Sequence, residues 1–169
     1  MANEPFPDAH WGREGVSPLF KPAYAFASTT AGSWFIRRLV PLDHRLMKRT
    51  NGRYTLFGPT SLPQLLLTTV GRKSGQPRTN PLSYLRDGDR LLLLGSNFGQ
   101  TTHPAWSSNL LAHPDTTVSL SGQVIDVSAT PLAGDERERA LDKFFAYPMY
   151  AAYRRRTDRN LRVFALTRR

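Results

Sequence analysis

The sequence predicts an α+β protein in which a small antiparallel β-barrel is flanked by helices. Five short strand-like runs lie between residues 65 and 131, and a sixth closes the chain. Two connections, around Gly88 and at Ser121-Gly122, carry hairpin signals that favour antiparallel neighbours over crossovers. A meander that turns so tightly tends to close on itself, which is why a barrel is expected.

The chain of 169 residues is long enough for one domain with a proper core and too short for two of ordinary size. Residues 1–31 are rich in Pro, Ala, Ser and Thr without a sustained period, and we expect an extended N-terminal arm. Residues 32–169 are then expected to form a single barrel domain.

Residues 32–53 are predicted to form an amphipathic, basic helix. Pro41 is expected to kink this helix or to begin a second one. The helix either caps the core of the domain or docks on an anionic bilayer, with Trp34 and Phe35 at the interface. The expected apolar face consists of Phe35, Leu39, Leu42 and Leu46, and the cations at other positions are Arg37, Arg38, Arg45, Lys48 and Arg49.

The remaining elements follow a turn at Asn51-Gly52. Pro104 and Pro148 are each placed to open a helix, because the first turn tolerates the missing N–H. Asp135 and Glu136 favour a helix start near Gly134 through the helix dipole. The predicted strands are 65–70, 80–85, 90–96, 116–120, 123–131 and 162–167, and the predicted later helices are 104–112, 134–145 and one beginning at 148.

The formal net charge of +10 calls for an anionic partner, which could be nucleic acid, an acidic membrane surface or an acidic small ligand. The cations fall into three groups, near residues 37–53, 72–78 and 154–169. No signature of a nucleic-acid-binding fold accompanies them, so nucleic acid is not expected as a partner.

Several common kinds of site are disfavoured. The chain has no cysteine, and His10, His44, His103 and His113 lie far apart in sequence without a carboxylate cluster, so no metal site is expected. No serine sits in a G-x-S-x-G elbow, and the glycines fit neither common nucleotide-binding motif. The N-terminus lacks a secretory signal and no apolar run approaches about 18 residues, which indicates a cytoplasmic protein.

The loop GRKSGQPR, residues 71–78, is the strongest candidate for an anion site. Its three cations, Arg72, Lys73 and Arg78, surround a glycine hinge between two predicted strands. Backbone N–H groups of such a turn can point at an oxyanion while the cationic side chains hold it from the sides. The alternative is an ordinary solvated hairpin turn.

Tyr147, Tyr150 and Tyr153 recur every three residues in AYPMYAAYRRRTDR. On a helix this spacing spreads them over about 120° of one side, so they could line a pocket together. Phenols provide apolar walls for a planar ring and a hydroxyl for a carbonyl or quinone oxygen. Core packing is the alternative. With so few reactive groups, an enzyme of this sequence would need a cofactor.

Three motifs in a fixed order resemble one family. GRKSGQPR, the SN…HPAW…NLLAHP segment and the Y-P-x-Y-x-x-Y…TDR ending resemble the deazaflavin-dependent nitroreductase family of actinobacterial quinone reductases, over residues 65–166. The resemblance implies a split β-barrel, like those that bind FMN. It also implies that a reduced 8-hydroxy-5-deazaflavin, coenzyme F420, passes a hydride to a quinone or nitro-compound.

The resemblance also implies the site residues. The basic loop would hold the phosphate and oligoglutamate tail of the coenzyme, Ser96 would lie near the deazaflavin, and the tyrosines would face the acceptor, with a hydroxyl or an ordered water supplying the proton. The implied catalytic residues are Tyr147, Tyr150, Tyr153 and Ser96. The implied coenzyme-binding residues are Arg72, Lys73, Ser74, Gln76, Arg78, Thr79, Asn80, Pro81, Gly95, Ser96, Asn97, Ala105, Trp106 and Asn109.

Three positions depart from the family pattern: Ser83 replaces a tyrosine beside the deazaflavin, Ser107 replaces a frequent aromatic residue, and Phe98 replaces a frequent glycine. Phe98 is expected to fill part of the space that the missing rings leave. An FMN-binding split-barrel oxidoreductase and a non-catalytic basic lipid- or nucleic-acid-binding module are the alternatives. The expected acceptor is a quinone or nitroaromatic compound, an anionic membrane surface is a further expected partner, and both a monomer and a homodimer fit the sequence.

Overall fold

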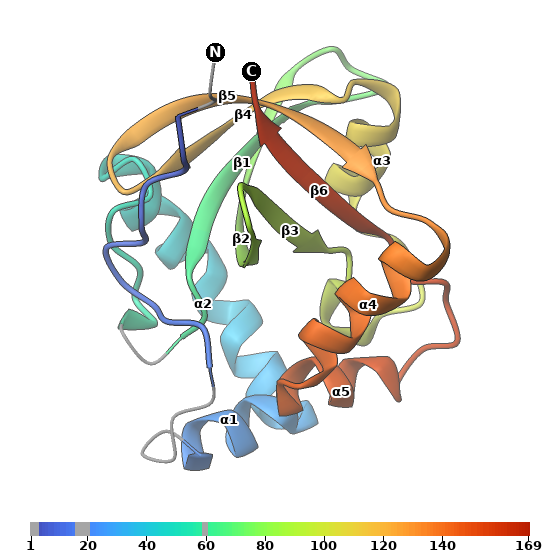
Figure 1. Cartoon of the computed structure of the whole chain (residues 1–169). Helices are drawn as coiled ribbons and strands as arrows, with labels where there is room; N and C mark the ends of the chain where they lie inside the picture. Colours follow the sequence, from blue (N-terminus) through green and yellow to red (C-terminus); the bar gives the residue numbers. More distant parts are fainter. Residues whose placement is uncertain (1–3, 16–20, 59–60) are drawn as a thin grey trace.

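The computed structural model describes residues 4–15, 21–58 and 61–169. Six antiparallel strands form a closed barrel in the order β1-β2-β3-β6-β5-β4, with helices at its sides and lower end (Figure 1). The predicted α+β barrel is therefore confirmed. The strands are β1 (Gln64–Val70), β2 (Pro77–Asp87), β3 (Arg90–Leu94), β4 (Asp115–Leu120), β5 (Gln123–Pro131) and β6 (Val163–Arg168).

The two predicted hairpins form as the turn residues require. Between β4 and β5, Leu120 pairs with Gln123, and both turn residues have positive φ, 52° at Ser121 and 87° at Gly122. Positive φ at both central positions is the type I′ geometry that matches the twist of the flanking strands. Gly88 supplies a φ of 60° at the turn between β2 and β3. These turns fix the antiparallel order.

Leucines fill both faces of β3. Leu91 and Leu93 point into the barrel core, while Leu92 and Leu94 belong to a second core between the barrel wall and the helices. Because side chains alternate across a strand, the continuous run RLLLL indicates a strand buried on both sides. The barrel interior is therefore closely packed, and the space outside its wall is left for a site.

The three later helices that the sequence predicts are also confirmed: α3 (Ala105–Ala112), α4 (Gly134–Phe145) and α5 (Pro148–Arg154). The structure adds a single 3₁₀ turn that was not predicted, η3 (Asn97–Gly99). Pro148 occupies the first turn of α5. Helices α4 and α5 pack on each other beside the barrel, and α5 approaches the first N-terminal helix (Figure 1).

The expectation of an extended arm over residues 1–31 is wrong for part of that segment. Residues 21–28 form helix α1 (Lys21–Ser28), while residues 1–3 and 16–20 lie outside the described residues. The segment KPAYAFAS has three alanines, which favour helix, and Pro22 stands in the first turn, where its missing N–H does no harm. Eight residues are too few to display a helical period.

Helix α2 (Thr30–Arg49) was predicted correctly in position, but its inner face was not. Pro41 lies inside this single helix, so of the two predicted alternatives the start of a second helix at Pro41 is wrong. The buried side presents Ser33, Asp43 and Met47. The predicted face lies one position away, and of its members Phe35 and Leu42 are exposed. Two adjacent faces of this helix are similarly apolar. The buried face contains the charged residue Asp43, so a hydropathy pattern does not identify it as the inner face.

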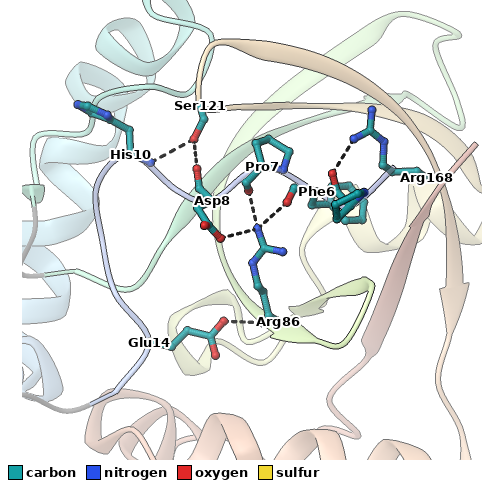
Figure 2. A network of polar contacts seen from close by, with 9 residues as sticks. Phe6, Pro7, Asp8, His10, Glu14, Arg86, Ser121 and Arg168 are labelled. Carbon is teal, nitrogen blue, oxygen red and sulfur yellow. Dashed lines mark hydrogen bonds and ion pairs between the residues drawn. The ribbon is translucent and has the colours of Figure 1, made fainter. Parts of the chain in front are cut away.

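Residues 4–15 form a strap across the barrel, which Figure 2 shows from close by. Phe6 is 4% exposed and belongs to the barrel core. The Arg86 guanidinium donates to the carbonyl oxygens of Phe6 and Pro7 and pairs with Asp8 at 3.2 Å. Arg168, near the end of β6, donates to the Pro5 carbonyl at 2.8 Å. The strap is thus tied to the barrel by a buried ring and by backbone contacts.

None of the helices in the described part of the chain combines the length and the apolar character that crossing a membrane requires.

We expect Phe6→Ala to lower the free energy of unfolding by about 3 kcal/mol, because the substitution leaves a cavity in the barrel core. Urea denaturation followed by circular dichroism measures this change. Trp11→Ala is the control, since Trp11 is an exposed ring on the same strap. A loss below about 1 kcal/mol for Phe6→Ala would show that the strap does not contribute to the fold.

Candidate functional site

A cavity of about 530 Å³ lies between the barrel wall and the helices. This volume is in the range of small-molecule sites, which are concave and mostly apolar with a few polar groups. Helices α1 and α2 cover it with Ala23, Ala27, Ile36, Val40 and Asp43. The other walls relevant to the site are Asn80, Pro81, Leu82 and Ser83 of β2, Ser96, Asn97, Phe98, His103, Ala105 and Trp106 of the segment after β3, and Tyr147, Tyr150 and Tyr153.

The three predicted tyrosines all line this cavity and are buried. The Tyr147 hydroxyl accepts a hydrogen bond of 2.8 Å from the Gly15 N–H at the end of the strap. The Tyr150 ring contacts Tyr153 edge-on at 6.1 Å between centroids. Tyr147 thus connects the N-terminal strap to the cavity wall.

Burial raises the pKa of Tyr150 well above the usual value for a phenol, and the hydroxyl of Ser83, which hydrogen-bonds to it, acts in the opposite direction. Burial also raises the pKa of Tyr153, while Ser33 and Arg156 lower it. Both phenols therefore keep their protons throughout the neutral pH range. The Tyr153 hydroxyl has no hydrogen-bond partner of good geometry among the described residues.

The basic loop lies beside the cavity rather than in its wall. Arg72, Lys73 and Arg78 are exposed, and within the described residues no carboxylate lies within ion-pair distance of them. Strand β2 begins at Pro77 and reaches the cavity wall at Asn80. At roughly 3.3 Å per strand residue, Arg78 lies within about 7 Å of that wall along the chain.

The backbone of this loop does not form the expected anion cradle. The N–H groups of Ser74 and Gly75 donate to the Gly71 carbonyl at 3.1 and 2.7 Å. The Arg72 N–H donates to the Asn109 side chain at 3.1 Å. Because these amides are used within the fold, anion binding at the loop depends on the cationic side chains.

Asn109 and Thr79, which were predicted to contact the coenzyme, make contacts within the fold. The buried Asn109 amide accepts from Arg72 and donates to the Thr69 hydroxyl at 3.0 Å, so it ties α3 to the loop and to β1. The Thr79 hydroxyl is 2.9 Å from that of Thr68 on the neighbouring strand. The structure does not place either residue, or Gly95, among the cavity-lining residues.

The segment after β3 is shaped by two residues in the left-handed region. Asn97 and Phe98 have φ of 47° and 55°, a conformation that glycine adopts more easily. The Asn97 amide donates to the Thr102 carbonyl at 2.9 Å and closes the loop. Phe98 packs against Tyr153 with 5.8 Å between ring centroids and lines the cavity.

Two functional features of the cavity were not predicted from the sequence. They are the hydrogen bond between the Ser83 and Tyr150 hydroxyls and the presence of His103 in the cavity wall. Arg159 contacts His103 and donates to the Gly95 and Ser96 carbonyls at 3.0 and 2.9 Å. His103 precedes the Pro104-Ala105-Trp106 segment, and Arg159 ends the TDR motif, so both lie in the motifs that were quoted. Their contact joins distant segments and has no signal in a single sequence.

A family model described as F420H(2)-dependent quinone reductase matches residues 41–168. The F420H(2)-dependent quinone reductase of Mycobacterium tuberculosis strain H37Rv is 35% identical over 136 residues, which cover 78% of this chain and 91% of that protein. Among solved structures, an F420-H2 dependent reductase, FDR-A, matches with a TM-score of 0.56 at 37% identity, over 62% of this chain and 93% of that one. Another, described as a domain-swapped dimer, matches with a TM-score of 0.58 at 32% identity, over 79% and 97%.

Proposed function

Because this chain belongs to the F420H(2)-dependent quinone reductase family, we propose that the cavity beneath α1 and α2 is the place where a hydride passes from reduced coenzyme F420 to a quinone. The chain is accordingly an oxidoreductase, and F420 is its coenzyme. One observation carries the assignment of the site. A loop of cations, which have no carboxylate partner among the described residues, continues as a strand that reaches a cavity lined by buried phenols.

The residues fit the coenzyme at both ends. Its acidic tail suits Arg72, Lys73 and Arg78, whose exposed side chains can reach phosphate and carboxylate oxygens. Its planar ring suits the largely apolar cavity, in which Pro81 and Trp106 provide flat apolar surface. Ser74 and Gln76 extend the loop end of this proposed binding surface. Asn80, Ser96, Asn97 and Ala105 extend the proposed ring end.

The chemistry is divided between the coenzyme and the protein. When bound, the reduced coenzyme supplies a hydride, and the quinone needs that hydride and one proton to become a hydroquinone. Tyr150 holds a proton on its hydroxyl oxygen at the cavity wall, because burial keeps its pKa high. We propose that this hydroxyl donates its hydrogen bond and then its proton to the quinone oxygen, and that the phenolate regains a proton from water through the Ser83 hydroxyl, which hydrogen-bonds to it. Tyr147 and Tyr153 complete the wall that orients the acceptor and excludes water.

Nitro-compounds are a second acceptor class in this proposal. They could enter the same cavity, because a nitro group also presents oxygens to the phenols. Ser83 and Ser107 leave less aromatic surface than the family pattern provides, and Phe98 restores part of it. A quinone therefore remains the preferred acceptor.

We further propose that α1 and α2 bring the protein to an anionic membrane. Phe26, Trp34, Phe35 and Leu42 are 51%, 52%, 48% and 53% exposed, and the Phe26 and Phe35 rings contact each other at 6.3 Å across the two helices. Exposed cations surround this apolar surface, which is the composition of an interfacial helix. They are Arg37, Arg38, Arg45, Lys48 and Arg49. Quinones that partition into lipid would then be close to the cavity.

Replacing Arg72 and Lys73 together by Ala should raise the dissociation constant for oxidised F420 at least tenfold, which corresponds to about 1.4 kcal/mol. Fluorescence titration measures it, with FMN and FAD titrated in parallel to test the flavin alternative. The matched control removes two other exposed cations, Arg49 and Arg139. An unchanged constant in the loop variant would remove its proposed role.

Tyr150→Phe should lower kcat with a quinone at least tenfold and change the F420 dissociation constant less than twofold, because it removes a proton donor and keeps the ring. Steady-state kinetics with menadione and the same titration measure both quantities. Tyr84→Phe is the control, since Tyr84 is a buried tyrosine in the barrel core. Weaker coenzyme binding with normal kcat would contradict the assignment.

Replacing Trp34, Phe35 and Leu42 by Ser should reduce binding to vesicles of anionic phosphatidylglycerol at least fivefold, because it removes the apolar part of the interface. Co-sedimentation at low and high salt measures this binding. The control replaces two exposed apolar residues elsewhere, Leu111 and Val124. Equal binding by both variants would exclude docking through α2. Point substitutions are preferable to deleting the helices, because α1 and α2 also cover the cavity.

A further inference from the structure

His103 lines the cavity, on the chain segment that also carries Ser96 and Ala105. Its Nδ1 atom is 2.8 Å from Nη1 of Arg159. A guanidinium can only donate hydrogen bonds, so Nδ1 must be the acceptor in this contact. The single proton of the neutral imidazole then resides on Nε2. Arg159 therefore fixes the tautomer of a histidine in the cavity wall.

Arg159 is itself held in place by several contacts. Its Nη1 and Nη2 atoms donate to the Gly95 and Ser96 carbonyls, so the guanidinium joins His103 to the end of β3. Arg162 lies nearby and donates to the hydroxyls of Ser107 and Ser108 at 3.3 and 3.0 Å. No carboxylate of the described chain forms an ion pair with either arginine. This wall of the cavity is therefore positively charged.

The Nε2 atom of His103 has no hydrogen-bond partner among the described residues, and it is not enclosed by protein atoms as the unpartnered Nε2 of His44 is. Its N–H is thus free to meet a ligand. Burial, Arg162 and Arg159, in that order, lower the pKa of His103 below its usual value. The imidazole is consequently neutral at pH 7. Protonation at lower pH would set an N–H on Nδ1 against the Arg159 N–H and break their contact.

We propose that His103 is a hydrogen-bond donor of the active site, through its Nε2–H, to an electron-rich carbonyl oxygen on a planar ring, and that Arg159 is the residue that positions it. The inference rests on the proposed function. Such an oxygen occurs on the deazaflavin and on the quinone. Positive charge from Arg159 and Arg162 strengthens the donor and favours an oxygen on which negative charge builds up.

Two substitutions of His103 separate the donor from the bulk of the ring. In His103→Asn the amide oxygen can take the place of Nδ1 and keep the Arg159 contact, but no group reaches the position of Nε2. In His103→Gln the amide nitrogen can reach that position and donate. We expect the Asn variant to lose at least tenfold, and the Gln variant less than threefold, in one of two quantities. These are the affinity for oxidised F420, measured by fluorescence, and kcat/KM for menadione.

The quantity that falls in the Asn variant shows whether His103 donates to the coenzyme or to the quinone. A loss in F420 affinity assigns it to the coenzyme, and a loss confined to kcat/KM assigns it to the quinone. Equal losses in both variants, or none in the Asn variant, would overturn the proposal. Melting temperatures control for folding.

A measurement on the ligand-free protein is independent of turnover. Nitrogen-15 NMR of the imidazole should show the proton on Nε2 in the wild type, and a mixture of tautomers in Arg159→Met. A proton on Nδ1 in the wild type would also overturn the proposal, even if the His103 variants do not fold. If the wild type does not bind F420, the proposed function fails with it, whereas the outcomes above overturn the role of His103 alone.

Discussion

Close packing of leucines on both faces of β3 decides where a ligand can bind in this protein. The inward pair, Leu91 and Leu93, helps to fill the barrel, so the barrel interior has no room for a coenzyme. The outward pair, Leu92 and Leu94, attaches α4 and α5 to the barrel wall. The helices are held against the barrel by this second core, and the cavity lies at its margin, under α1 and α2.

The site combines an exposed, positively charged loop with a buried cavity wall whose tyrosine hydroxyls are uncharged. The cationic side chains of the loop at residues 71–78 are exposed to water. The hydroxyls of Tyr150 and Tyr153 are removed from water, which keeps them protonated. Strand β2 connects the two within a few residues. A ligand with an anionic tail and an apolar ring fits this gradient, whereas a ligand without a tail would contact only the cavity.

Much of this arrangement follows from local sequence. Hairpin turns, proline at helix starts and the RLLLL run indicate the barrel and its helices. The family resemblance gave nine predicted site residues that line the cavity, among them Tyr150 and Trp106. Contacts between distant segments could not be predicted. Asn109 as a loop anchor, the buried face of α2 around Asp43, and the Arg159–His103 pair all depend on which surfaces meet in three dimensions. A single sequence does not indicate which distant segments come into contact.

Helix α1 and the first half of α2 lie outside the part of the chain that the family model matches. The family match begins at residue 41, halfway along α2, yet Ala23, Ala27, Ile36 and Val40 line the cavity. Part of the cavity lining thus lies upstream of the residues that the family model matches. The shape of the cavity is therefore set in part by residues outside the matched range, whereas all six strands and the three tyrosines lie within it.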